Sequence, residues 1–173
     1  MRRLPLLTAQ YNVYVDGGQN LLGLAEVTLP DFSALTETVT GAGIMGEIEV
    51  PSRGHMSALT FTLNFRSMLD DPLKLAISTV HNFDLRAAQS YEDITSFDRG
   101  EAKERYSIIG PVKSVKLGKR TPHAPWDASI EVAARRVEHF IDGKQMVEWD
   151  PINNIYKVNG VDIYQQVRAA IGG

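Results

Sequence analysis

The segment from Leu59 to Phe65 is the feature that most restricts the fold of this chain. It reads Leu-Thr-Phe-Thr-Leu-Asn-Phe, so large apolar side chains alternate strictly with Thr or Asn. A period of two places the four apolar side chains on one face of an extended strand. The segment therefore predicts a β-strand with one buried face.

A strand, a turn and a second strand are also indicated near the N-terminus. Tyr11 to Val15 alternates aromatic or branched residues with others, and Leu21 to Leu29 resumes an extended pattern. Asp16-Gly17-Gly18 between them tolerates positive φ, so these residues predict a hairpin. Pro30 ends its second strand, because proline cannot donate to a central ladder.

The C-terminal half carries a second hairpin signal. Ile130 to Ile141 is rich in β-branched and aromatic residues, Asp142-Gly143 is a strong turn signal, and Gln145 to Asp150 resumes the strand pattern. Arg135-Arg136 breaks the alternation, so we expect a bulge or a strand exposed on one side there. Asn159-Gly160 predicts a further tight turn.

The central part of the chain mixes strand signals with polar stretches. Phe83 to Ala87 alternates, and Arg105 to Leu117 is strand-like with an interruption at Gly110-Pro111. Residues from Tyr91 to Lys103 are mostly polar and predict a variable surface loop.

Two short helices are expected. Asp70-Asp71-Pro72 places an acidic cap before a proline suited to the first helical turn. Asp162 can cap a final helix that Gly172 ends. The apolar residues at helical spacing are Leu73, Ile77 and Val80 in the first helix and Ile163, Val167 and Ile171 in the second.

The predicted fold is mainly β: an antiparallel β-sandwich or barrel with one internal helix, a long extended loop and a short C-terminal helix. The 173 residues carry no internal repeat or linker, so they predict a single domain spanning residues 1–173. Cysteine is absent, which excludes thiolate catalysis and cysteine-ligated metal sites.

Regular periodicity is lost from Thr36 to Gly54, a stretch with four glycines and one proline. The sequence predicts a long loop or an extended arm here, over about residues 36–56. Unstructured loops longer than about 12–15 residues are uncommon in compact domains and are usually functional or disordered. Apolar side chains argue against disorder because they require a surface to bury against. These side chains belong to Ile44, Met45, Ile48 and Val50.

Motifs that would carry catalysis or bind a cofactor are not found. Gly41-x-Gly43-x-x-Gly46 matches a dinucleotide fingerprint, but it lacks the preceding buried strand and the following helix. The Asp70-Asp71 pair is better explained by helix capping than by acid-base chemistry. The histidines have no spacing typical of metal ligands and are expected on the surface or rim. They are His55, His81, His123 and His139. We expect no catalytic, cofactor-binding or metal-binding residues.

The charge pattern argues against a dedicated nucleic-acid or membrane binder. The net charge is −3, the isoelectric point is about 5.8, and Lys and Arg are scattered along the chain. No signal peptide or membrane-spanning stretch is indicated, so the protein is expected to be made and kept in the cytoplasm. Trp126 and Trp149 are expected in a core or an interface.

The C-terminal stretch 142–162 closely resembles the ending of major tail tube proteins from contractile-tailed phages. In that family a D-G-K hairpin leads to an acidic residue, then to I-N, K-V-N-G-V-D and a terminal helix. Three N-terminal segments agree with the family's N-V-x-x-x-G strand, its V-T-L-P strand end and its G-A-G-x-x-G loop. These segments are Tyr11 to Gly17, Val27 to Pro30 and Thr40 to Gly46.

This resemblance implies a β-barrel or sandwich subunit that assembles into stacked six-fold rings inside a contractile sheath, with a bore through which DNA passes in a phage. It implies sheath, baseplate or tube-initiator, and terminator proteins as partners, with only transient, non-specific DNA contact and no membrane. The expected location is a virion tail, or a phage-tail-like particle, assembled in the host bacterial cytoplasm. Tube subunits of secretion systems and of phage-tail-like bacteriocins are similar, so they remain alternatives.

The arm is then expected to contact neighbouring subunits, because its glycines allow close backbone approach and its apolar residues supply burial. The alternative is a flap packed against its own barrel, although such a flap would leave backbone groups hard to satisfy. The predicted contact residues are Gly41, Ala42, Gly43, Ile44, Met45, Gly46, Ile48, Val50 and Pro51.

Two functions of other classes remain as hypotheses. A β-sandwich ligand-binding module would need an aromatic platform or a cation site on one face, and the sequence shows neither. A small hydrolase would have to use Asp70 and Asp71 as its carboxylate pair.

Overall fold

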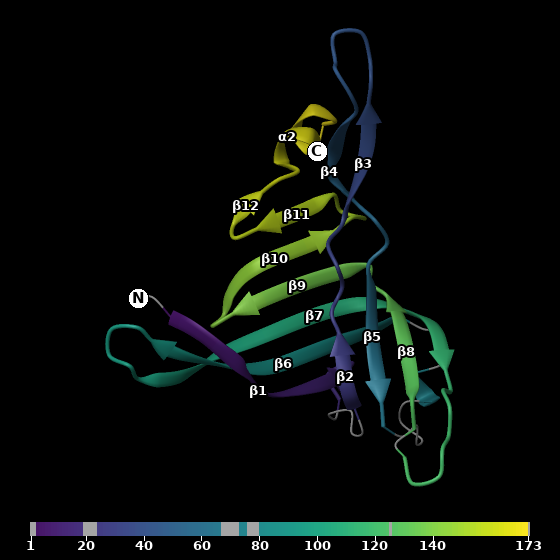
Figure 1. The fold of residues 1–173 in the computed structure, drawn as a ribbon, viewed down its shortest axis with the longest axis vertical. Helices are drawn as coiled ribbons and strands as arrows, with labels where there is room; N and C mark the ends of the chain where they lie inside the picture. Colours follow the sequence, from purple (N-terminus) through teal and green to yellow (C-terminus); the bar gives the residue numbers. More distant parts are fainter. Residues whose placement is uncertain (1–2, 19–23, 67–72, 76–79, 125, 173) are drawn as a thin grey trace.

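The computed structural model describes residues 3–18, 24–66, 73–75, 80–124 and 126–172 of the chain (Figure 1). Antiparallel strands dominate, and a short helix follows them near the C-terminus. In chain order the elements are β1 (Arg3–Val15), β2 (Leu24–Thr28), β3 (Ala34–Val39), β4 (Ile48–Met56), β5 (Thr60–Phe65), β6 (Val80–Asp93), β7 (Arg99–Lys116), β8 (Ala128–Ala133), β9 (Arg136–Ile141), β10 (Lys144–Asp150), β11 (Ile155–Val158), β12 (Val161–Asp162) and α2 (Gln165–Ala170).

The strands cross in two layers. In Figure 1, β6, β7, β9, β10 and β11 lie side by side across the view, while β2, β5 and β8 run along the long axis in front of them. The pairing order is β12-β11-β10-β9-β7-β8-β5-β2, with β6 and then β1 branching from β7. Layers crossing at a steep angle form an orthogonal sandwich. This architecture confirms the predicted antiparallel β-sandwich.

Side chains from both layers fill the space between them. Phe61, Leu63 and Phe65 of β5 are at most 2% exposed, which confirms the predicted strand with one buried face. The ring of Phe61 lies 5.6 Å from that of Phe83 on β6, measured between centroids. The rest of the buried core includes Val13, Leu85, Ile108, Ala128, Ile130, Val132, Val137 and Trp149.

β7 joins the two layers because it changes partners along its length. Its residues up to Pro111 pair with β6, and from Val112 onward it pairs with β8. The chain between β8 and β9 makes the opposite change, since β8 pairs with β5 and β9 pairs with β7. The two changes meet where the amide of Arg135 donates to the carbonyl of Ile109 at 2.7 Å. We call this place the sheet corner (residues 109–112 and 133–136).

Gly110 makes the sheet corner possible. A Cβ atom at this position would lie 2.1 Å from the carbonyl oxygen of Ala133 and 2.8 Å from its carbonyl carbon. Both atoms belong to the backbone, so no side-chain movement can relieve the overlap. The expected interruption at Gly110-Pro111 is therefore wrong, because β7 runs through these residues as one strand and changes its partner there. At Arg135-Arg136 we expected a bulge or a strand exposed on one side. The bulge is wrong, because β8 ends at Ala133, Arg135 lies between the strands, and Arg136 begins β9.

The face of β6 and β7 that points away from the core carries charged pairs. Arg86 and Arg105 both donate to the carboxylate of Asp84, each with a shortest N–O distance of 2.7 Å. Burial opposes the charge on Asp84, but these hydrogen bonds hold its pKa below the ordinary value. Further pairs on β9, β10 and β11 join Arg136 to Glu138 and Glu148, and Lys157 to Glu148.

Two predicted turns are confirmed. Asp142 and Gly143 have φ values of 48° and 80° and connect β9 to β10. Asn159 and Gly160, with φ values of 49° and 81°, connect β11 to β12. Paired positive φ values match the twist of the flanking strands, and Asp, Asn and Gly are the residues that tolerate them.

The predicted N-terminal hairpin is wrong in its pairing. β1 pairs with β6, and β2 pairs with β5 in the other layer. The turn after β1 is tied to β6 instead, because the Asp16 carboxylate accepts a hydrogen bond from the Asn82 amide at 2.8 Å. Residues 19–23, which would complete the predicted turn, lie outside the described part of the chain.

Two segments predicted as loops are strands. Tyr91 to Lys103 forms the end of β6 and the start of β7, joined by a short turn. Residues 36–56 fall almost entirely within β3, β4 and the turn between them, which form a separate two-stranded sheet. Both segments extend from the sandwich into solvent, so no buried core face imposes a sustained alternation on them.

The predicted internal helix falls largely outside the described residues, which do not include Asp70, Asp71, Pro72 and Ile77. Its last expected residue, Val80, begins β6. The predicted C-terminal helix is confirmed as α2, but it begins three residues after Asp162.

We expect Gly110→Ala to destabilise the fold by about 1–3 kcal/mol or more, because the added methyl group overlaps backbone that cannot move. Gly41→Ala is the matched control, since a Cβ there would have no atom within 4 Å and the position has no positive φ. Urea unfolding of both variants and of the wild type gives the comparison. Equal stability of the two variants would contradict the role assigned to the sheet corner.

Candidate assembly surfaces

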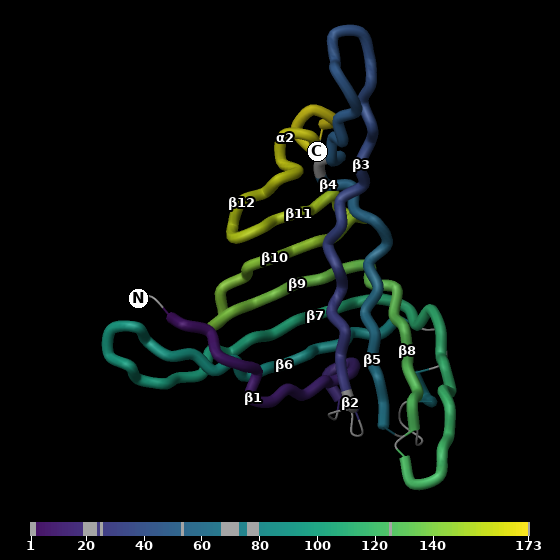
Figure 2. Tube along the Cα trace, viewed as in Figure 1, coloured from purple at the N-terminus to yellow at the C-terminus, as the bar shows by residue number. Residues whose placement is uncertain are grey.

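The hairpin of β3 and β4, here called the arm hairpin (residues 34–56), projects beyond the sandwich at one end of the molecule (Figure 2). Its register pairs Val39 with Ile48 and Glu37 with Val50. Opposed residues share a face, and side chains two apart along a strand do too. One face therefore carries Leu35, Glu37, Val39, Ile48 and Val50, and the other carries Thr36, Thr38, Glu49 and Pro51.

The apolar face of the arm hairpin is not covered by the part of the chain that the structure describes. Leu35, Val39, Ile48 and Val50 are each 41–51% exposed. A two-stranded hairpin is marginally stable alone, and a third strand or a packed surface is normally needed. Contiguous exposed apolar side chains of this kind are typical of protein-protein contact sites.

The tip of the arm hairpin is a glycine-rich turn. The amide of Ile44 donates to the carbonyl of Gly41 at 3.1 Å, and Gly43 and Gly46 have φ values of 91° and 122°. These positive φ values favour glycine. Met45 is fully exposed at the tip.

The predicted contact residues all lie on the arm hairpin and are all exposed. Ile48, Val50 and Pro51 belong to β4, and the other six form the tip. Sequence reasoning missed Leu35 and Val39 on β3, which complete the apolar face. Leu35 and Val39 are four residues apart, with Glu37 between them on the same face. This is a weak strand signal, because the sequence between the two apolar residues is entirely polar.

The base of the arm hairpin is anchored to the C-terminal part of the chain. The ring of Tyr164 lies against Gly54, where a Cβ atom would come within 2.3 Å of it. His55 contacts the same ring edge-on at 6.3 Å between centroids. The Ser57 amide donates to the Ser33 carbonyl at 2.9 Å. The arm hairpin is therefore held at its base, while its tip projects away from the sandwich.

The C-terminal segment presents a second unpartnered surface. None of the residues of α2 is buried, and Val161, Ile163 and Ile171 around it are exposed. The segment is tied down by polar contacts: Arg168 donates to the carboxylate of Asp162 and, at 2.7 Å, to the carbonyl of Asn154. The hydrogen bond from Arg168 lowers the pKa of Asp162 below its ordinary value.

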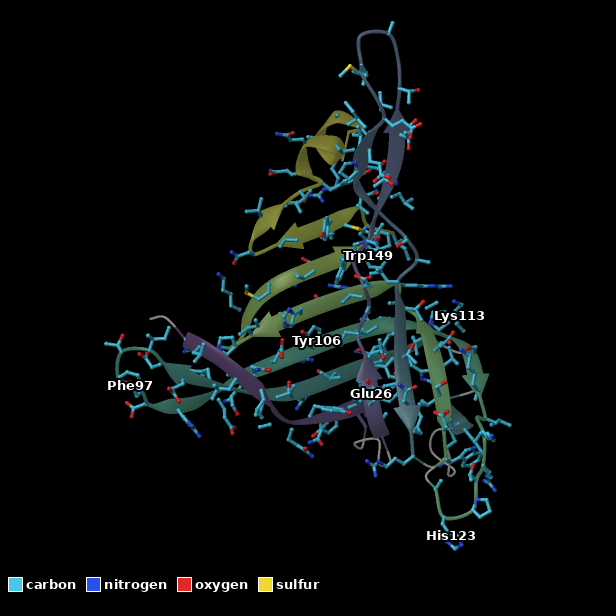
Figure 3. All side chains as sticks on the ribbon, viewed as in Figure 1. Glu26, Phe97, Tyr106, Lys113, His123 and Trp149 are labelled. Atoms are coloured by element: carbon cyan, nitrogen blue, oxygen red, sulfur yellow. The ribbon has the colours of Figure 1, made fainter. Side chains whose placement is uncertain are left out.

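A third apolar surface lies at the N-terminal end of β1 and at the turn between β6 and β7. Leu4, Leu6 and Leu7 are exposed on β1, as are Ile94 and Phe97 at the turn. Figure 3 shows Phe97 at the far end of this extension, well away from the arm hairpin.

Two histidines are less exposed than expected, because each is paired with a carboxylate. His81 lies 2.8 Å from Asp16, and His139 lies 2.8 Å from Glu104. Burial, together with its hydrogen bond to Glu104, raises the pKa of Tyr106, which stacks on His139. Among the described residues, no three His, Asp or Glu side chains are grouped as metal ligands would be. The Asp70-Asp71 pair lies outside them.

An open groove of about 690 Å³ lies beside β1, β6 and β7. Its charged lining includes Arg86 and Arg105, which are already bound to Asp84. No helix in the described part of the chain has the length and apolar character needed to cross a membrane.

Comparison with known proteins gives two findings. A family model described as phage tail tube protein FII matches residues 8–172. A tail tube protein of Escherichia phage P2 is 31% identical over 175 residues, covering 99% of this chain and 97% of that protein. Both matches span the sandwich, the arm hairpin and the C-terminal segment.

Asp162→Asn should weaken the C-terminal anchor in a pH-dependent way. Because the pKa of Asp162 is lowered in the folded chain, its pair with Arg168 stabilises the fold above the ordinary aspartate pKa of about 3.9. That contribution is lost as the pH falls through the lowered value. Urea unfolding should show the variant less stable than wild type at neutral pH and equal to it in strong acid. Asp31→Asn, at an exposed position, is the control, and a pH-independent difference for Asp162→Asn would contradict this account.

Proposed function

The chain belongs to the phage tail tube protein FII family and is a structural subunit of the virion tail, not an enzyme; we propose that it polymerises into stacked six-fold rings that form the inner tube of a contractile tail. The bore of this tube is the conduit through which DNA leaves the phage. The uncovered apolar face of the arm hairpin is the observation that carries the proposal, because it requires a partner that a polymer of identical subunits supplies.

The arm hairpin is proposed as the main contact between subunits. Its apolar face offers burial, and its glycine-rich tip offers backbone that a neighbour can approach closely. The contact residues are Gly41, Ala42, Gly43, Ile44, Met45, Gly46, Ile48, Val50 and Pro51, together with Leu35 and Val39.

The sheet edges support the same proposal. The paired order of the sandwich ends at β2 and β12, and the branch ends at β1. Edge strands have unpaired backbone groups that a neighbouring chain can satisfy. The exposed apolar residues near β12 and β1 are available for further subunits and for sheath, tube-initiator and terminator proteins.

The charge arrangement suits a conduit that does not hold DNA. Arg86 and Arg105 on the outward face of β6 and β7 are both paired with the carboxylate of Asp84. Paired cations release few counterions on meeting phosphate, so binding to DNA is weak. Transient, non-specific passage follows from this balance.

Val50→Asp should leave the subunit folded and abolish tube formation, because assembly would bury an unpaired carboxylate. Gln10→Asp, at an exposed position on β1 away from the arm hairpin, is the control for an added charge and should retain most assembly. Ile44→Asp and Met45→Asp test the tip in the same way. Negative-stain electron microscopy at rising protein concentration, with circular dichroism to check folding, gives the readout.

Hollow tubes or stacked rings of the wild-type protein would support the proposal. Normal tubes from Val50→Asp would show that the arm hairpin does not mediate assembly. A wild-type protein that stays monomeric at every concentration, even when tail fragments are added, would contradict the proposal that this chain polymerises.

A further inference from the structure

The two ends of the long axis of the molecule carry opposite charge. Along residues 34–52 the chain has Glu37, Glu47 and Glu49 and no lysine or arginine. Along residues 116–124, here called the basic loop, it has Lys116, Lys119 and Arg120 and no acidic residue. The arm hairpin is at one end of the view in Figure 1, and Figure 3 shows His123, within the basic loop, at the other end.

The basic loop has a defined shape. A Cβ atom at Gly118 would lie 1.3 Å from the carbonyl oxygen of Asp127, so the two sides of the loop touch at its base. The guanidinium of Arg120 lies 3.8 Å above the ring of Trp126, a cation-π contact. The amide of Trp126 in turn donates to the carbonyl of Arg66 at 2.8 Å, which ties the loop to the end of β5.

Both ends also expose apolar side chains among their charges. Met45 at the tip of the arm hairpin is fully exposed, and Leu117 in the basic loop is more than half exposed. Lys116 forms an ion pair with Glu131 of the same chain. Lys119 and Arg120 are therefore the cations of the basic loop that we consider for contact with a second copy. An apolar centre with charges around it is typical of the core and rim of a protein interface.

We infer that the arm hairpin of one subunit docks on the basic loop of a second copy in the next ring, with Glu47 and Glu49 facing Lys119 and Arg120. This inference rests on the proposed tube and assigns its ring-to-ring contact. A contact between opposite ends of identical molecules is heterologous and does not close on itself, so repetition extends the assembly along one direction. Complementary charge fixes the partner, because reversed stacking would bring like charges together.

Charge reversal at each end tests the pairing. The arm-reversed variant carries Glu47→Lys and Glu49→Lys, and the loop-reversed variant carries Lys119→Glu and Arg120→Glu. Each alone should lose at least about tenfold in sedimentable tube, because several such pairs act together across a ring junction. Each should still form single rings. Glu101→Lys, at an exposed position on β7, is the charge control and should stack normally.

Combination of the two variants should restore stacking. A chain with all four substitutions has both charges exchanged and should form tubes. A mixture of arm-reversed and loop-reversed proteins should co-assemble, because the reversed arm of one fits the reversed loop of the other and their unchanged ends fit each other. Normal tubes from either single variant, or failure of both combinations despite normal folding, would overturn the inference. Wild-type protein that forms no rings would instead contradict the proposed tube.

Cross-linking gives a second readout that does not depend on charge. The sequence has no cysteine, so Met45→Cys and Leu117→Cys place single thiols at the two ends. A mixture of the two proteins, treated in the assembled state with a short bis-maleimide, should give mainly the mixed dimer. Ile94→Cys replaces Leu117→Cys in the control. Equal yields with both partners would overturn the inference even if the charge variants misfold.

Discussion

The sheet corner at Gly110 is the constraint on which the rest of the structure depends. At this point β7 leaves one layer for the other, and the segment between β8 and β9 returns beside it. The backbones approach so closely that no side chain larger than hydrogen fits. Because β7 is continuous through the corner and belongs to both layers, it fixes how the two layers cross.

In one part of the molecule, side chains find partners within the chain; in another part, apolar side chains are left exposed to solvent. In the sandwich, apolar side chains fill the space between layers, and outward-facing charges such as Asp84 and Arg105 form ion pairs. The arm hairpin, the C-terminal helix and the N-terminal end of β1 expose apolar residues instead. In the proposed tube, stability lies in the first part and assembly in the second, so substitutions in the two parts should have separable effects.

Sequence reasoning succeeded where burial or backbone geometry leaves a local pattern. The alternation of Phe61, Leu63 and Phe65 and the positive-φ pair Asp142-Gly143 are examples. It failed where partners are distant: β1 and β2 were recognised as strands, but nothing local shows that they pair with β6 and β5. Composition predicts that the arm hairpin contacts a neighbour, and this stays a prediction. Its strands were missed because their alternation is short and is interrupted by glycine and threonine residues.

The marginal stability of the arm hairpin bears on the kinetics of growth. A free subunit holds this hairpin only by its base, at Tyr164 and Ser33, so part of its conformational entropy is still to be lost on docking. When two free subunits associate, the arm hairpins of both must lose this conformational entropy. When a subunit adds to a growing end, the end already presents an ordered surface. In the proposed tube, elongation is therefore faster than nucleation, and a subunit pool can persist at high concentration until a template appears.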